Sequence, residues 1–312
     1  MEKQKIIAVA GPTASGKTSL AVCIAERKNG EVISNDSMQI YRGMKIGTAA
    51  PTAEETHGIP HHMIGTVDPS AEFSCADYSE AAKDIINEVS SRGKLPVFCG
   101  GTGLYLDSVL KVEDFSASVK NDELRESLSV FAEHNGADAL HERLRKVDPE
   151  AADAIHKNNV RRVIRAIEIF ETTGITKTEW DRRSAFAESP YDATIIVLDF
   201  LSRELLYERC DKRVDIMFRE GLENEVSELW ENGLLSPDRP AFQAIGYKEF
   251  IPYFEGKISL DSVKESIKLS TRHYAKRQIT WFRRYNNAVI LHPDREDGTV
   301  KSSEELFEEA GL

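Results

Sequence analysis

The segment from residue 11 to residue 18 combines two glycines, a lysine and three hydroxyl side chains at a spacing that suits a phosphate chain. Its residues are Gly11, Pro12, Thr13, Ala14, Ser15, Gly16, Lys17 and Thr18. The glycines let backbone N–H groups turn inward, Lys17 can reach the outer phosphates, and the Thr18 hydroxyl can ligate Mg²⁺. The segment therefore predicts a bound phosphate compound, without saying which one.

Asp36 follows the apolar run Glu31–Ser34, as the phosphate loop follows the apolar run Ile6–Ala10. A carboxylate at that place could ligate Mg²⁺, bind a ribose or act as a general base. The structural alternative is a turn or N-cap aspartate. Its position beside the phosphate loop favours a functional role.

Two arginines further along, Arg209 and Arg213, are four residues apart and share one face of a predicted helix. Such a pair can close over a polyphosphate and offset the charge of a leaving group. Pairing with neighbouring acids, such as Glu208 and Asp215, is the alternative. Asp199 either supports Mg²⁺ or caps this helix, and we rank it below Asp36.

The chain has 312 residues, of which 41% are hydrophobic, and this favours a large α/β core with an inserted or appended unit. No apolar run has the length of a membrane span, and the first residues lead directly into a strand rather than a signal peptide. We therefore expect a soluble cytoplasmic protein without a membrane partner. The four cysteines are widely spaced, which indicates reduced thiols rather than disulfides or zinc ligands.

Short apolar runs alternate with helical patterns, which predicts an α/β fold with a doubly wound parallel sheet. The predicted strands are Ile6–Ala10, Glu31–Ser34, Leu95–Cys99, Thr194–Asp199 and Ala288–Leu291. The carboxyl ends of the first three carry the phosphate loop, Asn35–Gln39 and Gly100–Tyr105. Because parallel strands end at one edge of a sheet, we expect these three segments to converge on one crevice.

Residues 116–188 interrupt this alternation, because they show helical periodicity and almost no strand pattern. We therefore predict a core formed by residues 1–115 and 189–312, with a mostly helical insertion between them. The insertion carries a basic stretch that includes Arg161, Arg162 and Arg165.

The chain has 40 basic and 52 acidic residues, a formal net charge of −12, which by itself argues against a polyanionic partner. The segment Lys264–Arg284 is different, with seven basic residues and one acid. Lys264, Lys268, Arg272 and Lys276 recur every four residues and would form one stripe on a helix. Such a stripe is either a solvated face or, with its interleaved aromatic rings, a surface for RNA.

With these motifs in place, the chain resembles the tRNA dimethylallyltransferases. The phosphate loop, the run from Asn35 to Met44, the Gly-rich turn Gly100–Tyr105, the motif Phe242–Tyr247 and the segment Ala275–Arg283 carry the resemblance in the family's order. The phosphate loop alone is shared by many unrelated enzymes. Its combination with Asp-Ser-Met-Gln-Ile-Tyr and Lys-Arg-Gln-Ile-Thr-Trp-Phe is highly specific.

The resemblance implies a P-loop NTPase-like fold and transfer of a dimethylallyl group from dimethylallyl diphosphate to N6 of the adenosine 3′-adjacent to the anticodon. It implies that the phosphate loop holds the diphosphate with Mg²⁺ on Thr18. Asp36 would be the general base, and Thr13, Thr102 and Arg213 would complete the catalytic set.

The resemblance also implies tRNA as a partner, bound through its anticodon stem-loop by what we expect to be a monomer. The predicted contacts are Asp36, Ser37, Met38, Gln39, Arg125, Arg161, Arg162, Arg165, Phe242, Gln243, Ala244, Ile245, Gly246, Tyr247, Arg277, Gln278, Trp281, Arg283 and Arg284. Two alternatives remain at this stage. One is a small-molecule kinase whose loop holds ATP, and the other is a non-catalytic RNA-binding module with a regulatory nucleotide.

Overall fold

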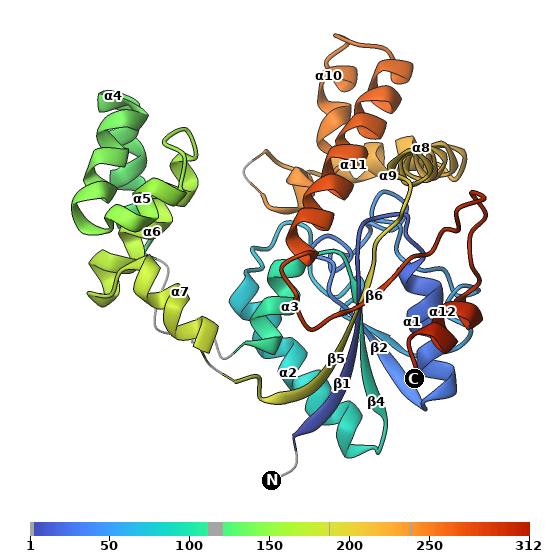
Figure 1. Cartoon of the computed structure of the whole chain (residues 1–312). Coiled ribbons are helices and arrows are strands. Elements are labelled where there is room, and N and C mark those ends of the chain that lie inside the picture. Colours follow the sequence, from blue (N-terminus) through green and yellow to red (C-terminus); the bar gives the residue numbers. More distant parts are fainter. Residues whose placement is uncertain (1–2, 112–120, 187, 238) are drawn as a thin grey trace. The chain divides into compact units, whose positions relative to one another are not determined.

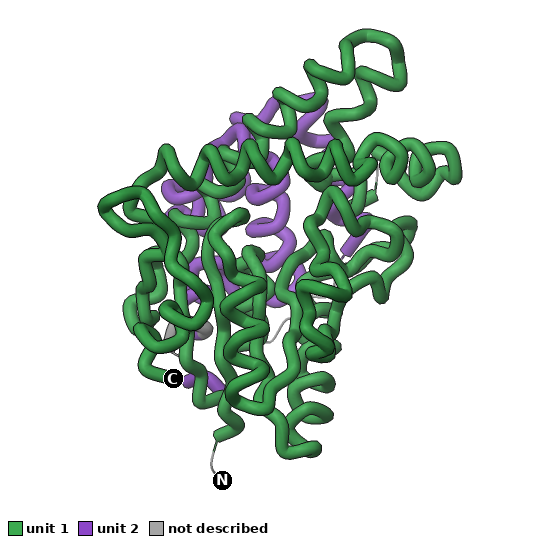
Figure 2. The backbone as a smooth tube through the Cα atoms, turned by 90° about the vertical axis from the view of Figure 1, so that its right-hand side faces the viewer, with its two compact units in different colours: residues 1–110, 191–312 green, residues 111–190 purple. Residues whose placement is uncertain are grey.

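The computed structural model describes residues 3–111, 121–186, 188–237 and 239–312 (Figure 1). The chain divides into two compact units, which we name the sheet unit (Met1–Leu110 with Tyr191–Leu312) and the helical unit (Lys111–Pro190) (Figure 2). The predicted boundary at residue 116 lies outside the described residues, so the predicted limits of the insertion stay a prediction.

The sheet unit is built on a parallel sheet with the order β3-β2-β4-β1-β5-β6 among the described residues. Its strands are β1 (Gln4–Ala10), β2 (Gly30–Ser34), β3 (His61–His62), β4 (Leu95–Gly100), β5 (Tyr191–Leu198) and β6 (Val289–Leu291). All five predicted strands are present, and the α/β class with a parallel sheet is confirmed. The edge strand β3 was not predicted, because two residues carry no readable pattern.

Helices cover both faces of this sheet (Figure 1). The helices of the sheet unit are α1 (Lys17–Arg27), α2 (Cys75–Ser91), α3 (Gly103–Leu110), α8 (Arg203–Arg219), α9 (Leu222–Glu231), α10 (Ile251–Phe254), α11 (Leu260–Phe282) and α12 (Ser303–Glu309). Ile7 and Val9 of β1 share a core with α1 and α12, whereas Ile6 and Ala8 share a core with α2 and α3. Burial on both faces explains why the strands read as continuous apolar runs.

The helices α8, α9 and α11 lie beyond the carboxyl ends of the strands (Figure 1). The turn into α8 is fixed by the buried Asp294, whose carboxylate accepts the N–H groups of Leu201 and Ser202, each at 2.8 Å. Ser202 then caps the helix by accepting the N–H of Leu205. These contacts aim α8 across the edge of the sheet where the phosphate loop lies.

The helical unit contains α4 (Asp122–Val147), α5 (Pro149–Ala154), α6 (Val160–Thr173) and α7 (Lys177–Phe186). Leu128, Leu140 and Leu144 of α4 pack against Val163 and Ile167 of α6 in a core of its own. In the part of the chain that the structure describes, no helix of either unit combines the length and apolarity that crossing a membrane requires.

Candidate active site

The phosphate loop joins β1 to α1 at the carboxyl edge of the sheet. Gly11 has a φ of +141°, and a Cβ atom there would lie 2.7 Å from the carbonyl oxygen of Leu198 on β5. Gly16 has a φ of +92° and forms the left-handed N-cap of α1. Both glycines are therefore needed to fold the loop back over the N-terminus of α1, where backbone N–H groups favour anions.

Two helices far along the chain hold this loop in place. From α8, Arg213 donates an Nη1 hydrogen bond to the Thr13 hydroxyl at 3.1 Å, and Arg209 donates from Nε to the Ala14 carbonyl at 2.8 Å. From α11, the side-chain oxygen of Gln278 accepts the N–H of Thr13 at 2.8 Å. Arg213, predicted to act with Thr13 on the leaving group, thus contacts the Thr13 hydroxyl directly, whereas Arg209 supports the loop backbone rather than closing over it.

Lys17 places its ammonium group within the loop, where it donates to the Pro12 carbonyl at 2.5 Å. Burial lowers the pKa of Lys17 to about 8, and the nearby positive charge of Arg213 acts in the same direction. A bound anion would oppose both effects, because a nearby negative charge favours the ammonium form and raises the pKa of Lys17. Lys17 is therefore placed to hold an anion through its charge.

Asp36 lies at the end of β2 in the turn that follows the strand. Its Oδ1 accepts the N–H of Met38 at 2.9 Å and that of Gln39 at 3.4 Å, so the predicted turn geometry and a functional position coexist. Burial raises the pKa of the Asp36 carboxyl group, while these N–H groups and the charges of Lys17 and Arg213 oppose that rise. A carboxylate of raised pKa beside a phosphate loop is suited to accept a proton.

The Gly-rich turn after β4 joins this segment to the rest of the edge. The Thr102 hydroxyl accepts the N–H of Ser37 at 3.0 Å, and the Thr102 N–H donates to the Asn35 carbonyl at 3.2 Å. Since Gln278 also bonds the Gly101 carbonyl at 3.0 Å, the three segments predicted to converge do so.

The oxygen atoms near the loop fit a magnesium ion. The Ser15 hydroxyl is buried without a hydrogen-bond partner among the described residues. Burial raises the pKa of the Cys99 thiol to about 11, and the neighbouring Thr18 hydroxyl opposes that rise. No cluster of three His, Cys, Asp or Glu side chains suited to a metal occurs in the described ranges. Mg²⁺ bound with substrate phosphates needs only one or two protein ligands, so this arrangement accommodates it.

The predicted basic stripe on α11 needs a correction. Lys264 and Lys268 form ion pairs with Asp215 on α8, at 2.9 and 3.0 Å. Arg272 binds both oxygens of Asp211, at 2.7 and 2.6 Å. The first half of the stripe therefore joins α11 to α8, because the two acids repeat at the same four-residue spacing as the basic residues.

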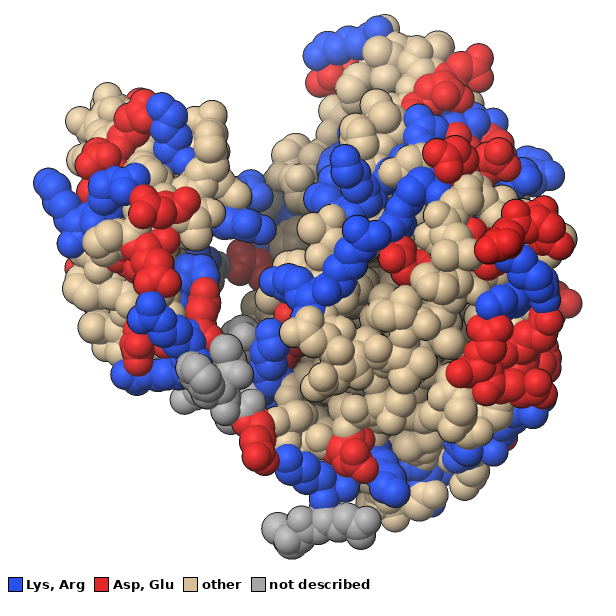
Figure 3. Space-filling model, in the orientation of Figure 1, with Lys and Arg blue, Asp and Glu red and all other residues tan. Residues whose placement is uncertain are grey.

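Near the end of α11 and just after it, two arginines stack on aromatic rings. Arg284 stacks on Trp281 at 3.9 Å from the ring centroid, and Arg277 on Tyr274 at 5.5 Å. Arg283 is 65% exposed, although it lies 3.5 Å from a carboxylate oxygen of Asp199. Figure 3 shows basic side chains gathered in a band on this unit. Cations stacked on rings at a surface can bind phosphates and bases together.

The motif Phe242–Tyr247 was predicted to contact tRNA, but most of its side chains belong to the core. Phe242, Ala244 and Tyr247 are buried, and only Gln243 is exposed. The Tyr247 hydroxyl donates to Glu225 of α9 at 2.7 Å. The same carboxylate accepts the N–H groups of Lys45, Ile46 and Gly47 at 2.8–3.0 Å. The motif thus anchors the loop that follows the Asp36 turn.

In the helical unit, the predicted arginines divide into two groups. Arg125 of α4 binds the fully buried carboxylate of Glu168 on α6 at 2.8 Å and so joins the two helices, while Arg165, also on α6, binds the same carboxylate at 2.6 Å. Arg161 and Arg162 are exposed near the start of α6. The second pair is therefore the more exposed of the two, while the first is partly exposed and already engaged with Glu168.

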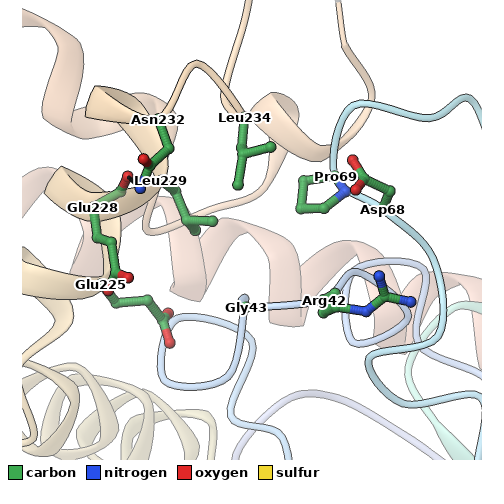
Figure 4. Close-up of a pocket in the computed structure, with 9 residues that line it drawn as sticks. All are labelled: Arg42, Gly43, Asp68, Pro69, Glu225, Glu228, Leu229, Asn232 and Leu234. Atoms are coloured by element: carbon green, nitrogen blue, oxygen red, sulfur yellow. Dashed lines mark hydrogen bonds between the residues drawn. The ribbon is translucent and has the colours of Figure 1, made fainter.

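A cavity of about 220 Å³ lies apart from this edge (Figure 4). Glu225, Glu228 and Leu229 of α9 line one side, and Arg42 and Asp68 come from the loops opposite. None of the residues predicted for catalysis or for phosphate binding lines it.

The sequence model of the family described as IPP transferase matches residues 39–285 of this chain. The chain belongs to the IPP transferase family. The match begins after the phosphate loop and Asp36, so the roles of those residues rest on the geometry described above.

Relatives and solved structures agree with IPP transferase membership. The tRNA dimethylallyltransferase of Caldanaerobacter subterraneus is 48% identical over 305 residues, which cover 97% of this chain and 96% of the relative. A tRNA isopentenylpyrophosphate transferase crystal structure from Bacillus halodurans is 43% identical, with a TM-score of 0.71, and 99% of this chain and 95% of that chain are covered. A eukaryotic dimethylallyltransferase described as acting on tRNA is 32% identical, with a TM-score of 0.80, covering 93% and 74% of the two chains.

Sequence reasoning on this IPP transferase missed several supporting residues. Glu225 lies in no motif and at no distinctive spacing, and only its backbone partners reveal its role. The spacing of Asp211 and Asp215 was a readable signal, since it matches the basic stripe. Tyr274 was noticed only as an interleaved ring, yet the charge of Asp36 adds to the rise that burial causes in the pKa of its phenol, and Thr102 opposes that rise.

Proposed function

We propose that this chain transfers a dimethylallyl group from dimethylallyl diphosphate to the exocyclic N6 of the adenosine 3′-adjacent to the anticodon of tRNA. The observation that carries the proposal is the placement of Asp36, a carboxylate of raised pKa, at the same edge as a phosphate loop that holds Lys17 and Arg213. The names of the relatives support the choice of donor group and acceptor.

The donor diphosphate occupies the phosphate loop in this proposal. The bond between the allylic carbon and the diphosphate oxygen breaks, and its electron pair moves onto the leaving diphosphate. Lys17, Arg213 and the N-terminus of α1 stabilise that developing charge, which grows as the bond breaks. Thr13 contributes its hydroxyl, oriented by Arg213. When Mg²⁺ is bound, it supplies further charge neutralisation at the diphosphate, with the Thr18 hydroxyl as a ligand.

The acceptor nitrogen needs help because its lone pair is delocalised into the adenine ring. As N6 forms its bond to the allylic carbon, one N6 proton passes to the Asp36 carboxylate. Met38 and Gln39 hold that carboxylate in place through their N–H groups. Proton transfer to a positioned base is typically worth about 10²–10⁴-fold in rate.

A stacked adenine cannot reach a partly buried carboxylate, so the base must turn out of the anticodon loop. Ser37, Met38 and Gln39 then flank the inserted base. Arg277, Trp281, Arg283 and Arg284 on or next to α11, together with Arg161 and Arg162 of the helical unit, bind the surrounding RNA. The acidic remainder of the chain disfavours binding of RNA elsewhere.

Mass analysis of tRNA nucleosides tests this proposal. Purified protein is incubated with unmodified tRNA, Mg²⁺ and dimethylallyl diphosphate, and in parallel with labelled ATP and a set of nucleosides or shikimate-type acids. The proposal expects an isopentenyl-adenosine nucleoside in the first reaction and no phosphorylated product in the second. An unchanged adenosine pool would overturn it, and phosphorylation in the second reaction would favour the kinase alternative.

A further inference from the structure

Gln278 lies on α11 among side chains proposed to bind tRNA, yet it is only 4% exposed. Its side-chain oxygen accepts the N–H of Thr13 at 2.8 Å, and its side-chain nitrogen donates to the Gly101 carbonyl at 3.0 Å. Burial raises the pKa of the Tyr274 phenol, one helical turn earlier, and the neighbouring side chains of Thr102 and Gln278 oppose that rise. The predicted tRNA contact at Gln278 therefore needs a different account.

The two backbone partners of Gln278 lie in two different segments, one proposed to hold the donor and one next to the proposed base. Thr13 is part of the phosphate loop that holds the donor. Gly101 precedes Thr102, which bonds Asn35 and Ser37 on either side of Asp36. One carboxamide thus links the donor loop to the segment that carries the base.

We propose that Gln278 is a positioning residue that sets the separation between the diphosphate in the phosphate loop and the Asp36 carboxylate. The inference rests on the proposed prenyl transfer. The allylic carbon, N6 and the base must align in one geometry, and a displacement of about 1 Å can cost about 10²-fold in rate. Gln278 acts through Thr13 and Gly101 and touches neither substrate.

The chemistry of the site requires an amide at this position. A carboxylate would still accept the N–H of Thr13 but would repel the Gly101 carbonyl, and an aliphatic side chain would leave both backbone groups without their partner. The same arrangement requires glycine at position 101, because a Cβ atom added there would lie 1.9 Å from the Gln278 nitrogen. The next nearest atom outside that side chain, the Gly11 carbonyl oxygen, is 3.5 Å away.

Steady-state kinetics and tRNA binding on Gln278→Ala provide the first test. We expect kcat to fall by about 10²-fold with the dissociation constant for tRNA unchanged within about twofold, because the side chain is buried. Arg284→Ala is the matched comparison on the same surface, and it should raise the dissociation constant for tRNA. Gln278→Glu, which keeps the size of the side chain, should lower kcat like Gln278→Ala and covers the case in which the alanine variant does not fold.

A double-mutant cycle with Gly101→Ala provides the second test. Gly101→Ala alone should lower kcat strongly, because its methyl group displaces the Gln278 side chain. In the Gln278→Ala background the same change should add little, since the obstructing nitrogen is gone. Additive losses, or a Gln278→Ala variant with weakened tRNA binding and normal kcat, would overturn the positioning role. Failure of the proposed function is distinguishable, because the unaltered protein would then form no prenylated nucleoside.

Discussion

Two ionisable side chains beside the phosphate loop, Asp36 and Lys17, have pKa values shifted in opposite directions. Burial disfavours the charged form of both Asp36 and Lys17, so it raises the pKa of the carboxyl group and lowers that of the ammonium group. Each group stabilises the charge of the other. A diphosphate in the loop would strengthen the charge of Lys17.

Asp36→Asn removes the proposed base and keeps the size of the side chain. The amide oxygen can still accept the N–H groups of Met38 and Gln39, so the turn should persist. We expect single-turnover prenylation to fall by about 10²–10⁴-fold, with tRNA affinity retained. In the unaltered protein the rate should decline as pH falls, because protonation removes the base, and this decline should begin above the ordinary carboxyl pKa of 3.8. Loss of tRNA binding in the variant would contradict the role.

Lys17 should make diphosphate binding sensitive to alkaline pH. Its pKa of about 8 means that the ammonium charge is present below that pH and is lost as pH rises through it. Calorimetric titration with inorganic pyrophosphate should therefore show affinity falling between about pH 7 and pH 9. Lys17→Arg is the control, because a guanidinium keeps its charge over this range. An equal fall in the control would assign the effect to another group.

The residue types predicted the chemistry at the carboxyl edge of the sheet, but they did not predict which side chains are exposed to solvent. The loop glycines, Lys17 and Asp36 could be placed from spacing alone, because their positions follow apolar strands. The motif Phe242–Tyr247 and Gln278 were predicted to contact tRNA, yet the structure buries most of their side chains. Burial depends on which elements pack together, and that information is distributed over the whole chain.

Helix α9 and the Phe242–Tyr247 motif support the loop that follows the Asp36 turn. Glu225 binds the backbone of residues 45–47, and the carbonyls of Thr48 and Ala49 in turn accept the Gln39 side chain, each at 3.2 Å. Gln39 lies in the turn of Asp36. A helix remote from the reacting atoms is thereby linked to the base.

Removing the Glu225 carboxylate should disturb both stability and rate. Glu225→Ala leaves three backbone N–H groups and the Tyr247 hydroxyl without their acceptor, so we expect a loss of about 3 kcal/mol in the free energy of unfolding. Prenylation should also slow, as the Asp36 turn loses support. Glu228→Ala is the matched control, since Glu228 is exposed on the same helix and lines the same cavity. Equal denaturation midpoints for the two variants would refute the anchoring role.

The pairing of α8 with α11 shows what periodicity can and cannot supply. The four-residue repeat of Lys264, Lys268 and Arg272 correctly predicts one helix face. It cannot say whether RNA or protein lies opposite, and here the partner is the acidic face of α8. The equal spacing of Asp211 and Asp215 would have favoured the protein partner.

Because the whole chain is acidic, binding of RNA requires that exposed basic side chains gather on one part of its surface. By our proposal, that role falls to the arginines at the end of α11 and to Arg161 and Arg162 of the helical unit. Arg125 and Arg165 form ion pairs with the buried Glu168 and so stabilise the helical unit.

Arg161→Ala with Arg162→Ala should weaken tRNA binding without altering the affinity for pyrophosphate. If each arginine contacts a phosphate, the slope of log affinity against log salt should decrease by about 1 per residue removed. Arg143→Ala is a suitable control, because Arg143 pairs with Glu171 in the same unit. Filter binding at several salt concentrations measures both slopes. A slope equal to that of the control would exclude these two arginines from the RNA surface.

The position of β1 in the sheet has a consequence for biosynthesis. Its partner β5 begins at Tyr191, which pairs with Gln4, so during synthesis β1 lacks this neighbour until the residues up to Leu198, the end of β5, have been made. The intervening helical unit has its own core and can fold during that interval. An apolar strand with an open edge is prone to pair with other chains. We therefore expect nascent chains released before Leu198 to aggregate, and slower translation through the helical unit to lower the yield of folded protein.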